Sequence, residues 1–173
     1  MPGATAEGQG EGIPTFLYSC RMKPNNLATR ARHCLLLADT DAKITALDAL
    51  HADWQKGAVP PPDSTEHAQP IDAPGRPEKP PLVSPQNLPR RSVATREGHA
   101  ALIHAITHIE FNAINLAIDA VYRFRELPRD YYSDWLQVAF EEAQHFRLLR
   151  EHPRNLGHDY GAFNAHNGLW EMA

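Results

Sequence analysis

The chain has 173 residues, of which 42% are hydrophobic and 22% charged, and its formal net charge is −4. This composition predicts one soluble domain with an ordered or partly ordered extension. The 17 Lys and Arg residues are outnumbered by 21 Asp and Glu and form no long basic block, so we expect no nucleic-acid interface. No apolar run approaches the ~20 residues that cross a bilayer, so we expect no membrane span.

The first 24 residues are glycine-rich and polar, which predicts a disordered N-terminal segment over residues 1–24. They contain neither the basic start nor the apolar core of a secretory signal, so we expect a cytoplasmic protein. Cys20 and Cys34 are the only cysteines and have no CxxC spacing. They are therefore interpreted as reduced thiols.

Residues 25–57 predict a helical hairpin. The stretch Asp39–Asp41 supplies a break and an N-cap between its two helices, and Gly57 supplies the stop. His33 and His51 have no matching ligand set here, so we interpret them as surface or hydrogen-bonded histidines. The residues expected to face inward are Leu27, Ala31, Cys34, Leu35 and Ala38 in the first helix, and Ile44, Leu47, Leu50 and Trp54 in the second.

Residues 58–92 form a proline-rich segment, since ten of the 15 prolines fall between Pro60 and Pro89. Such a segment is neither helix nor central strand, and it predicts an extended, polyproline-like conformation. A flexible linker and a ligand for a proline-binding module are two interpretations. We favour a third, an ordered strap along the helices, because Ile71, Leu82, Val83 and Leu88 offer apolar contacts.

The first long helix is predicted from about residue 95 to Leu127, with Ser92 or Thr95 as N-cap. Glu110 falls inside its apolar arc, which should face inward. That arc contains Leu102, Ile103, Ile106, Ile109, Ala113, Ile114, Leu116, Ala117, Ala120, Val121 and Phe124. The remaining arc is polar and should face outward, with its two histidines exterior or packed on the strap. It contains His104, His108, Asn112, Asn115 and Asp119.

A second long helix should begin at Pro128 and end near Pro153. Glu142 and His145 lie in the middle of its predicted inward face, whereas Glu141 projects to the opposite side. The apolar members of that face are Tyr131, Trp135, Val138, Ala139, Phe146 and Leu149.

Two inward carboxylates and an imidazole favour a bound cation, because a buried ionised carboxylate costs several kcal/mol unless it is paired. The Glu142–His145 spacing of i, i+3 sets both side chains on one helical face. With a Glu from an antiparallel helix, this unit forms half of the dinuclear carboxylate site of four-helix bundles. We therefore predict Glu110, Glu142 and His145 as ligands of iron or manganese. A chance Glu-x-x-His in a surface ion pair or a cap is the alternative.

Three stretches, HIEFNAINLAIDAVYRF, FEEAQHFRLL and EHPRNLGHDYGAFNAHNGLWEMA, resemble a bacterial ferritin-like family long described only as a domain of unknown function. The resemblance covers roughly residues 27–173. It implies an all-α, ferritin-like four-helix bundle whose first two long helices carry Glu110, Glu142 and His145. It also implies a second Glu and a second carboxylate-x-x-His on two later helices. The family is distantly similar to di-iron tRNA hydroxylases, which leaves RNA open as a partner.

The predicted bundle over residues 93–173 is half of such a fold, and residues 168–173 look like the start of a third helix. One interpretation is a fragment that exposes half a core, and this is the one we favour. The other is a homodimer in which two chains pair about a two-fold axis and complete a site for two metal ions.

Three function classes follow from these patterns. The first is a di-metal oxidoreductase or oxygenase of unknown substrate, complete or as an inactive fragment, in which Glu142 bridges the ions. The second is an iron-handling ferroxidase, and the third is a non-enzymatic helical interaction module. His166, in the loop sequence AHNGLW, is a candidate hydrogen-bond donor at the mouth of the metal site. A loop histidine bonded to the backbone is the alternative.

Overall fold

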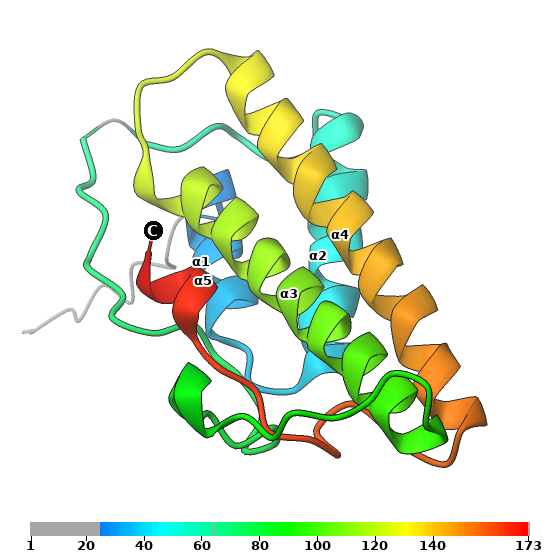
Figure 1. Cartoon of the computed structure of the whole chain (residues 1–173). Helices are drawn as coiled ribbons and strands as arrows, with labels where there is room; N and C mark the ends of the chain where they lie inside the picture. The colour runs from blue at the N-terminus through cyan, green and yellow to red at the C-terminus, as the bar shows by residue number, and fades with distance from the viewer. Residues whose placement is uncertain (1–24, 64, 173) are drawn as a thin grey trace, which may run out of the picture.

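Two long antiparallel helices, α3 (Arg96–Arg123) and α4 (Arg129–Asn155), form the larger part of the structure (Figure 1). The computed structural model describes residues 25–63 and 65–172, so the predicted disordered segment 1–24, with Cys20, lies outside the described residues. Across the described ranges the ordered elements are helices, and an isolated β-bridge joins Leu82 to Ala165. The predicted all-α class is therefore confirmed.

A helical hairpin packs behind the long pair, with α1 (Leu27–Leu36) on α3 and α2 (Thr40–Gln55) on α4 (Figure 1). Both helices are capped at their N-termini, where Asn26 accepts a hydrogen bond from the Thr29 amide and Asp39 one from the Ala42 amide. Ala38 is exposed, contrary to expectation, because it follows the end of α1. The core between hairpin and long pair includes Leu27, Leu35, Leu47, Leu50, Trp54, Phe111, Ile114, Ile118, Tyr132, Leu136 and Phe146.

The proline-rich segment, residues 58–92, runs extended across one side of the helices and contains a short 3-10 helix, η1 (Pro85–Asn87) (Figure 1). Its backbone bonds to other parts of the chain: the Gly75 amide donates to Leu35 O (2.8 Å) and the Val83 amide to Ala165 O (2.8 Å). A Cβ on residue 75 would lie 2.2 Å from Leu36 O, so only glycine fits there.

The interpretation of the two faces of α3 is confirmed for Ile114, Ala117, Ala120 and Val121, which are buried, but it was wrong for the polar arc and for the exposed part of the apolar arc. The predicted outward residues are buried, with exposed fractions of 1% for His104 and 0% for Asn115, whereas Leu102 and Ile109 on the predicted inward arc are 44% and 51% exposed. On α4 the prediction is confirmed for Ala139 and Phe146, which are buried, but it was wrong for Trp135, which is 37% exposed. The other buried residues of α4 are Tyr132, Leu136, Ala143 and Pro153. The polar face of α3 turns inward because Lys43 of α2 and the C-terminal loop provide hydrogen-bond partners for it.

Lys43 is one of these partners and is itself fully buried. Its ammonium donates to Leu35 O (2.8 Å) and to Asn115 Oδ1 (2.6 Å), so one side chain of α2 links α1 and α3. Burial lowers the pKa of Lys43 to about 7. The hairpin and α3 are thus joined by a polar contact inside an otherwise apolar core.

The ends of the long helices also differ from the prediction. α3 ends at Arg123 rather than at Leu127, and the connecting turn includes Glu126 with a φ of 61°. α4 continues through Pro153 to Asn155. The proline costs the hydrogen bond that its own amide would make, but it lies within the last turn and does not stop the helix there.

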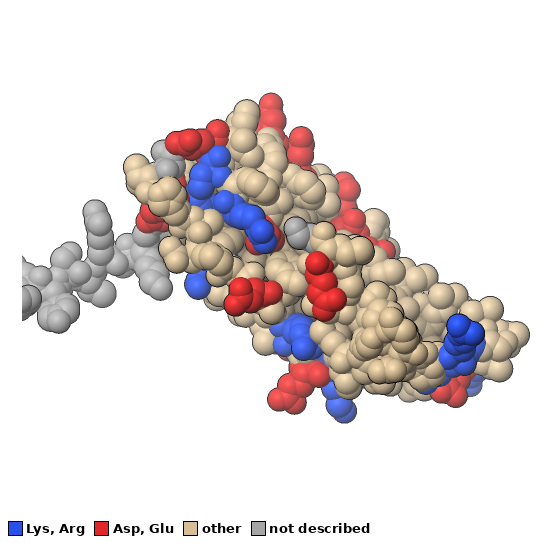
Figure 2. Space-filling model, turned by 60° about the vertical axis from the view of Figure 1, so that its left-hand side comes forward, with Lys and Arg blue, Asp and Glu red and all other residues tan. Residues whose placement is uncertain are grey.

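The charged residues in view in Figure 2 form small groups of both signs, separated by wide stretches without charge. This distribution agrees with the small net charge of −4 and gives that face no continuous basic surface. Among the described residues, α3 is long and apolar enough to cross a membrane by length and composition, with a mean hydropathy of 1.2. Half of that apolar window is buried in the fold, as in core helices, so it is weak evidence for a membrane span.

Replacing Lys43 by Met should change how stability depends on pH. The pKa of Lys43 is lower in the folded than in the unfolded chain, so its contribution rises as pH increases from about 7 toward the unfolded value. In metal-free protein, the free energy of unfolding of the wild type minus that of Lys43→Met should increase between pH 7 and 9, by about 1 kcal/mol per pH unit. Urea denaturation measures this, and a constant difference would contradict it.

Candidate metal centre

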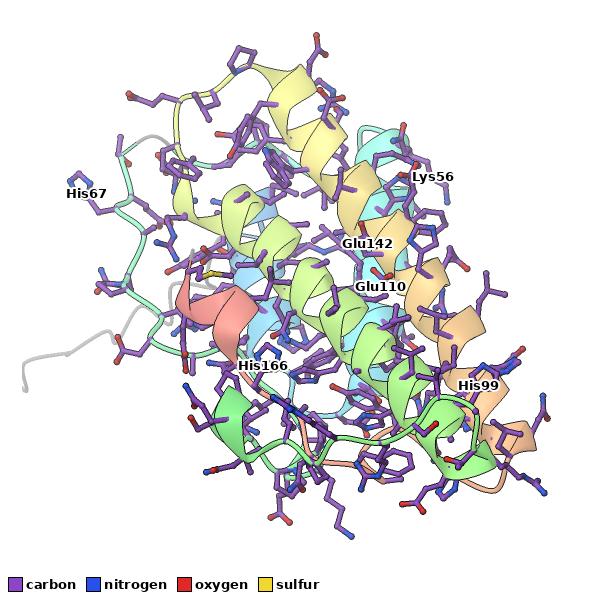
Figure 3. All side chains as sticks on the ribbon, viewed as in Figure 1. Lys56, His67, His99, Glu110, Glu142 and His166 are labelled. Carbon is purple, nitrogen blue, oxygen red and sulfur yellow. The ribbon has the colours of Figure 1, made fainter. Side chains whose placement is uncertain are left out.

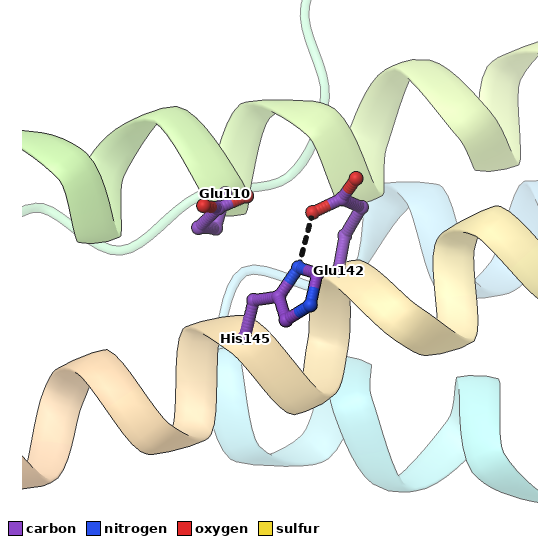
Figure 4. A group of neighbouring side chains, drawn as sticks. All are labelled: Glu110, Glu142 and His145. Carbon is purple, nitrogen blue, oxygen red and sulfur yellow. Dashed lines mark hydrogen bonds and ion pairs between the residues drawn. The ribbon is translucent and has the colours of Figure 1, made fainter.

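Glu110 of α3 and Glu142 and His145 of α4 meet where the two long helices touch (Figure 4). One ligand atom of each lies within 4.8 Å of the others, which makes this group a candidate metal site. The antiparallel packing sets the middle of α3 beside the middle of α4, and the i, i+3 spacing turns both α4 side chains to the same side. The structure thus brings together the three residues predicted as ligands.

The group is accessible from outside, so the prediction that His145 faces inward was wrong. Glu142 is 24% exposed and His145 is 55% exposed, while Glu110 is half-buried. Glu110 and Glu142 lie between α3 and α4, on the side away from the hairpin (Figure 3). Phe111 and Phe146 adjoin two of the three residues in sequence but point inward, and their rings pack 5.9 Å apart between centroids. The three residues thus lie at the surface, while the neighbouring phenylalanines belong to the buried core.

His145 is hydrogen-bonded within the group, its Nδ1 donating to Glu142 Oε2 at 3.0 Å (Figure 4). This bond to Glu142 raises the pKa of His145. Burial favours a higher pKa for Glu142, but its interactions with Glu110 and His145 outweigh burial and lower it. His145 is thus the one residue of the group that can carry a positive charge.

This arrangement disfavours the ionised form of Glu110. Partial burial and the neighbouring Glu142 carboxylate together raise the pKa of Glu110 to about 7. Among the described residues, no Lys or Arg forms an ion pair with either glutamate. Two adjacent carboxylates with an imidazole fit a divalent cation, since a bound ion supplies the positive charge that Glu110 lacks.

His166 does not join this group. Its Nδ1 accepts a hydrogen bond from the Gly168 amide (3.1 Å), and its carbonyl accepts one from His108 Nε2 (3.1 Å). It lies in the C-terminal loop beside α3, and Figure 3 shows it apart from Glu110 and Glu142. These contacts are those of a loop histidine bonded to backbone. The suggestion that it donates to a metal ligand has no support from these bonds.

The polar residues on the buried face of α3 form a second cluster. We had expected these residues to face outward. His108 Nδ1 accepts from the Tyr160 hydroxyl (2.8 Å), and His104 Nε2 accepts from the Gly161 amide (2.9 Å). Burial lowers the pKa of both histidines to about 4, so both are neutral at pH 7. They hold the C-terminal loop on α3. Their spacing of four residues repeats toward Asn112, and this period was the sequence signal for a second buried face.

Residues 36–173 match the family described as "Protein of unknown function (DUF455)". The chain belongs to this family. It is also similar to an uncharacterized protein of Haemophilus influenzae, with 55% identity over 104 residues, which cover 56% of this chain and 36% of the relative. The chain thus matches about a third of that protein. No solved structure matches it.

Membership in DUF455 confirms the resemblance at the level of a family of unknown function. The ferritin-like and di-metal properties remain predictions for this chain. The candidate site lies within the matched range 36–173, so it belongs to the part of the chain that the family describes.

Replacing Glu110 by Gln should stabilise the metal-free chain at pH 8 and leave its stability unchanged at pH 4. A raised folded-state pKa contributes stability below the unfolded value, about 4.5, and this contribution is lost as pH rises through about 7. An uncharged amide avoids that loss. Urea denaturation at both pH values measures the effect. Glu141→Gln, at an exposed position one residue from Glu142, is the matched control and should change little. Equal effects of Glu110→Gln and Glu141→Gln on the free energy of unfolding would contradict the raised pKa of Glu110.

Proposed function

We propose that this chain binds iron or manganese through Glu110, Glu142 and His145, as part of a ferritin-like di-metal oxidoreductase. The observation that supports the proposal best is the convergence of two carboxylates and one imidazole at the contact of two long antiparallel helices. Oxygen and imidazole donors suit divalent metals that change oxidation state. Paired long helices with an inward Glu and a Glu-x-x-His unit are the arrangement of di-metal carboxylate proteins.

Each of the three residues would have a distinct role in binding the metal. Glu142 interacts with both other residues, so its carboxylate would be the ligand shared within the site. His145 would offer a ring nitrogen once its proton leaves, and Glu110 would lose its proton as the ion replaces the imidazolium as counter-charge. When bound, iron or manganese supplies one-electron redox chemistry toward oxygen or peroxide.

His145 is 55% exposed, so a reactant could reach the cluster from the α3–α4 surface. This exposure suits an oxidoreductase whose substrate approaches from that surface. The ferroxidase alternative uses the same ligands, and its distinguishing result is an iron mineral after turnover with no organic product.

A non-enzymatic interaction module is the second candidate, and one observation favours it. Large apolar side chains are exposed along α3, with Ile109 beside Glu110 at 51% and Phe124 at the C-terminal end at 50%. Soluble proteins use contiguous apolar surface of this kind to bind other proteins. Under this alternative the chain binds a partner but no metal, and substitution of Glu142 has no effect on that binding.

Replacing Glu142 by Ala should abolish stoichiometric metal binding, because Glu142 contacts His145 and neighbours Glu110. We expect the affinity for Mn²⁺ to fall by more than about tenfold, since even groups that only support metal ligands change affinity 10–100-fold. Elemental analysis and calorimetric titration measure it. Glu141→Ala is the matched control, as Glu141 is exposed and bonds to Gln137 rather than to the site. If the two variants bind Mn²⁺ as the wild type does, the proposal fails.

A further inference from the structure

A cavity of about 620 Å³ lies between α1, the proline-rich segment and the C-terminal end of α3. Arg32 of α1 and Arg125, just after α3, both line it, and the proline-rich segment contributes His67. Figure 3 shows His67 well apart from Glu110 and Glu142, and neither glutamate lines the cavity. The volume falls within the range of small-molecule sites, roughly 300–1,000 Å³. We call this space the arginine cavity.

The wall that the proline-rich segment forms is fixed by a pair of hydrogen bonds. The Tyr122 hydroxyl accepts from the Gln69 amide (2.8 Å) and donates to Gln69 O (2.9 Å). Both residues line the arginine cavity, and Tyr122 is 5% exposed. The segment is therefore already in place on the end of α3, so a ligand would bind without the entropic cost of ordering it.

Arg125 is held in position without a carboxylate partner among the described residues. Its Nε donates to Glu66 O at 3.3 Å and its Nη1 donates to Tyr122 O. The guanidinium lies over the Tyr122 ring, 5.3 Å from the ring centroid, and the side chain is partly buried. Both of its hydrogen bonds go to neutral carbonyl oxygens, so its charge has no counter-charge. A guanidinium has five N–H donors, so others remain for a ligand.

The arginine cavity has an excess of positive charge in a chain whose formal net charge is −4. Its lining includes Arg32 and Arg125 but one acidic residue, Glu66. Six other arginines in the described part of the chain form ion pairs with Asp or Glu, whereas these two do not. The cavity thus brings together two guanidinium groups that have not been neutralised by the protein.

We propose that the arginine cavity binds a small organic anion, whose carboxylate or phosphate group lies against Arg32 and Arg125. The planar guanidinium group matches both kinds of oxyanion with parallel hydrogen bonds. His33 and His67 also line the cavity and can each donate an N–H to the same group. Leu36 offers an apolar contact for the rest of the ligand. This site is separate from the candidate metal centre and does not depend on it.

The test is a titration of the 173-residue chain, free of metal and chelator, with benzoate and with phenyl phosphate at pH 7. Both anions should bind saturably, with dissociation constants below about 1 mM. In nuclear magnetic resonance spectra they should shift the backbone amide signals of Thr29 and Gln69, which line the cavity on opposite elements. Phenol has a similar ring without the anionic group and should not shift them. The anion that binds more tightly identifies the oxyanion that the cavity prefers.

Substitutions at the cavity should change the affinity in both directions. Arg125→Gln should weaken the binding of both anions by about tenfold or more, since it removes a charged hydrogen-bond donor. Arg32→Gln should weaken it by about threefold or more, because Arg32 is exposed. Glu66→Gln removes the acidic residue of the lining and should strengthen binding by about two- to fivefold. Arg90→Gln is the matched control, because Arg90 is an exposed arginine of the proline-rich segment outside the cavity.

Four results would overturn the proposal. They are no saturable binding of either anion, equal binding of phenol, wild-type affinity in both variants of the cavity arginines, and an equal loss of affinity in Arg90→Gln, which would indicate attraction to the overall charge. Circular dichroism establishes that each variant is folded. Arg32 and Glu66 are exposed, so their variants decide the matter even where Arg125→Gln does not fold. Because the titration is free of metal, its failure leaves the proposed metal site intact.

Discussion

The hydrogen bonds on the buried face of α3 determine how that helix is turned, and the rest of the structure depends on this rotation. Asn115 binds the buried ammonium of Lys43, while His104 and His108 bind the C-terminal loop. A buried polar group that loses its partner costs about 1–3 kcal/mol, so rotating α3 would forfeit several such bonds together. With the polar face held inward, Glu110 must lie on the opposite side, where α4 presents Glu142 and His145.

This rotation explains what the sequence could and could not predict. The two long helices and the three candidate ligands were predictable, because helical period and the i, i+3 spacing depend only on local geometry. The burial of the polar arc was not predictable, because periodicity detects a stripe but does not say which surface covers it. α3 has two stripes of the same period, one apolar and one polar. The polar stripe is buried only because Lys43 and Tyr160, distant in sequence, supply partners.

The apolar stripes of α3 and α4 and the three ligands are therefore properties of one surface. Ile109 is 51% exposed beside a glutamate whose pKa is raised by partial burial and a neighbouring carboxylate. Solvent satisfies the carboxylates but leaves the apolar side chains exposed. On this surface the carboxylates favour contact with water, whereas the apolar side chains favour burial.

A covering element that lacked metal ligands would favour the apolar side chains but not the carboxylates. It would bury Ile109 and Trp135 but also desolvate Glu110 and Glu142, and an uncompensated buried charge costs several kcal/mol. That penalty would offset much of the gain from the apolar contacts, at about 25 cal/mol per Å² buried. A bound divalent ion removes the penalty because it provides the counter-charge within the interface. The covering element and the metal should consequently stabilise each other, since the apolar contacts exclude water from the site and the ion makes it possible to bury the carboxylates.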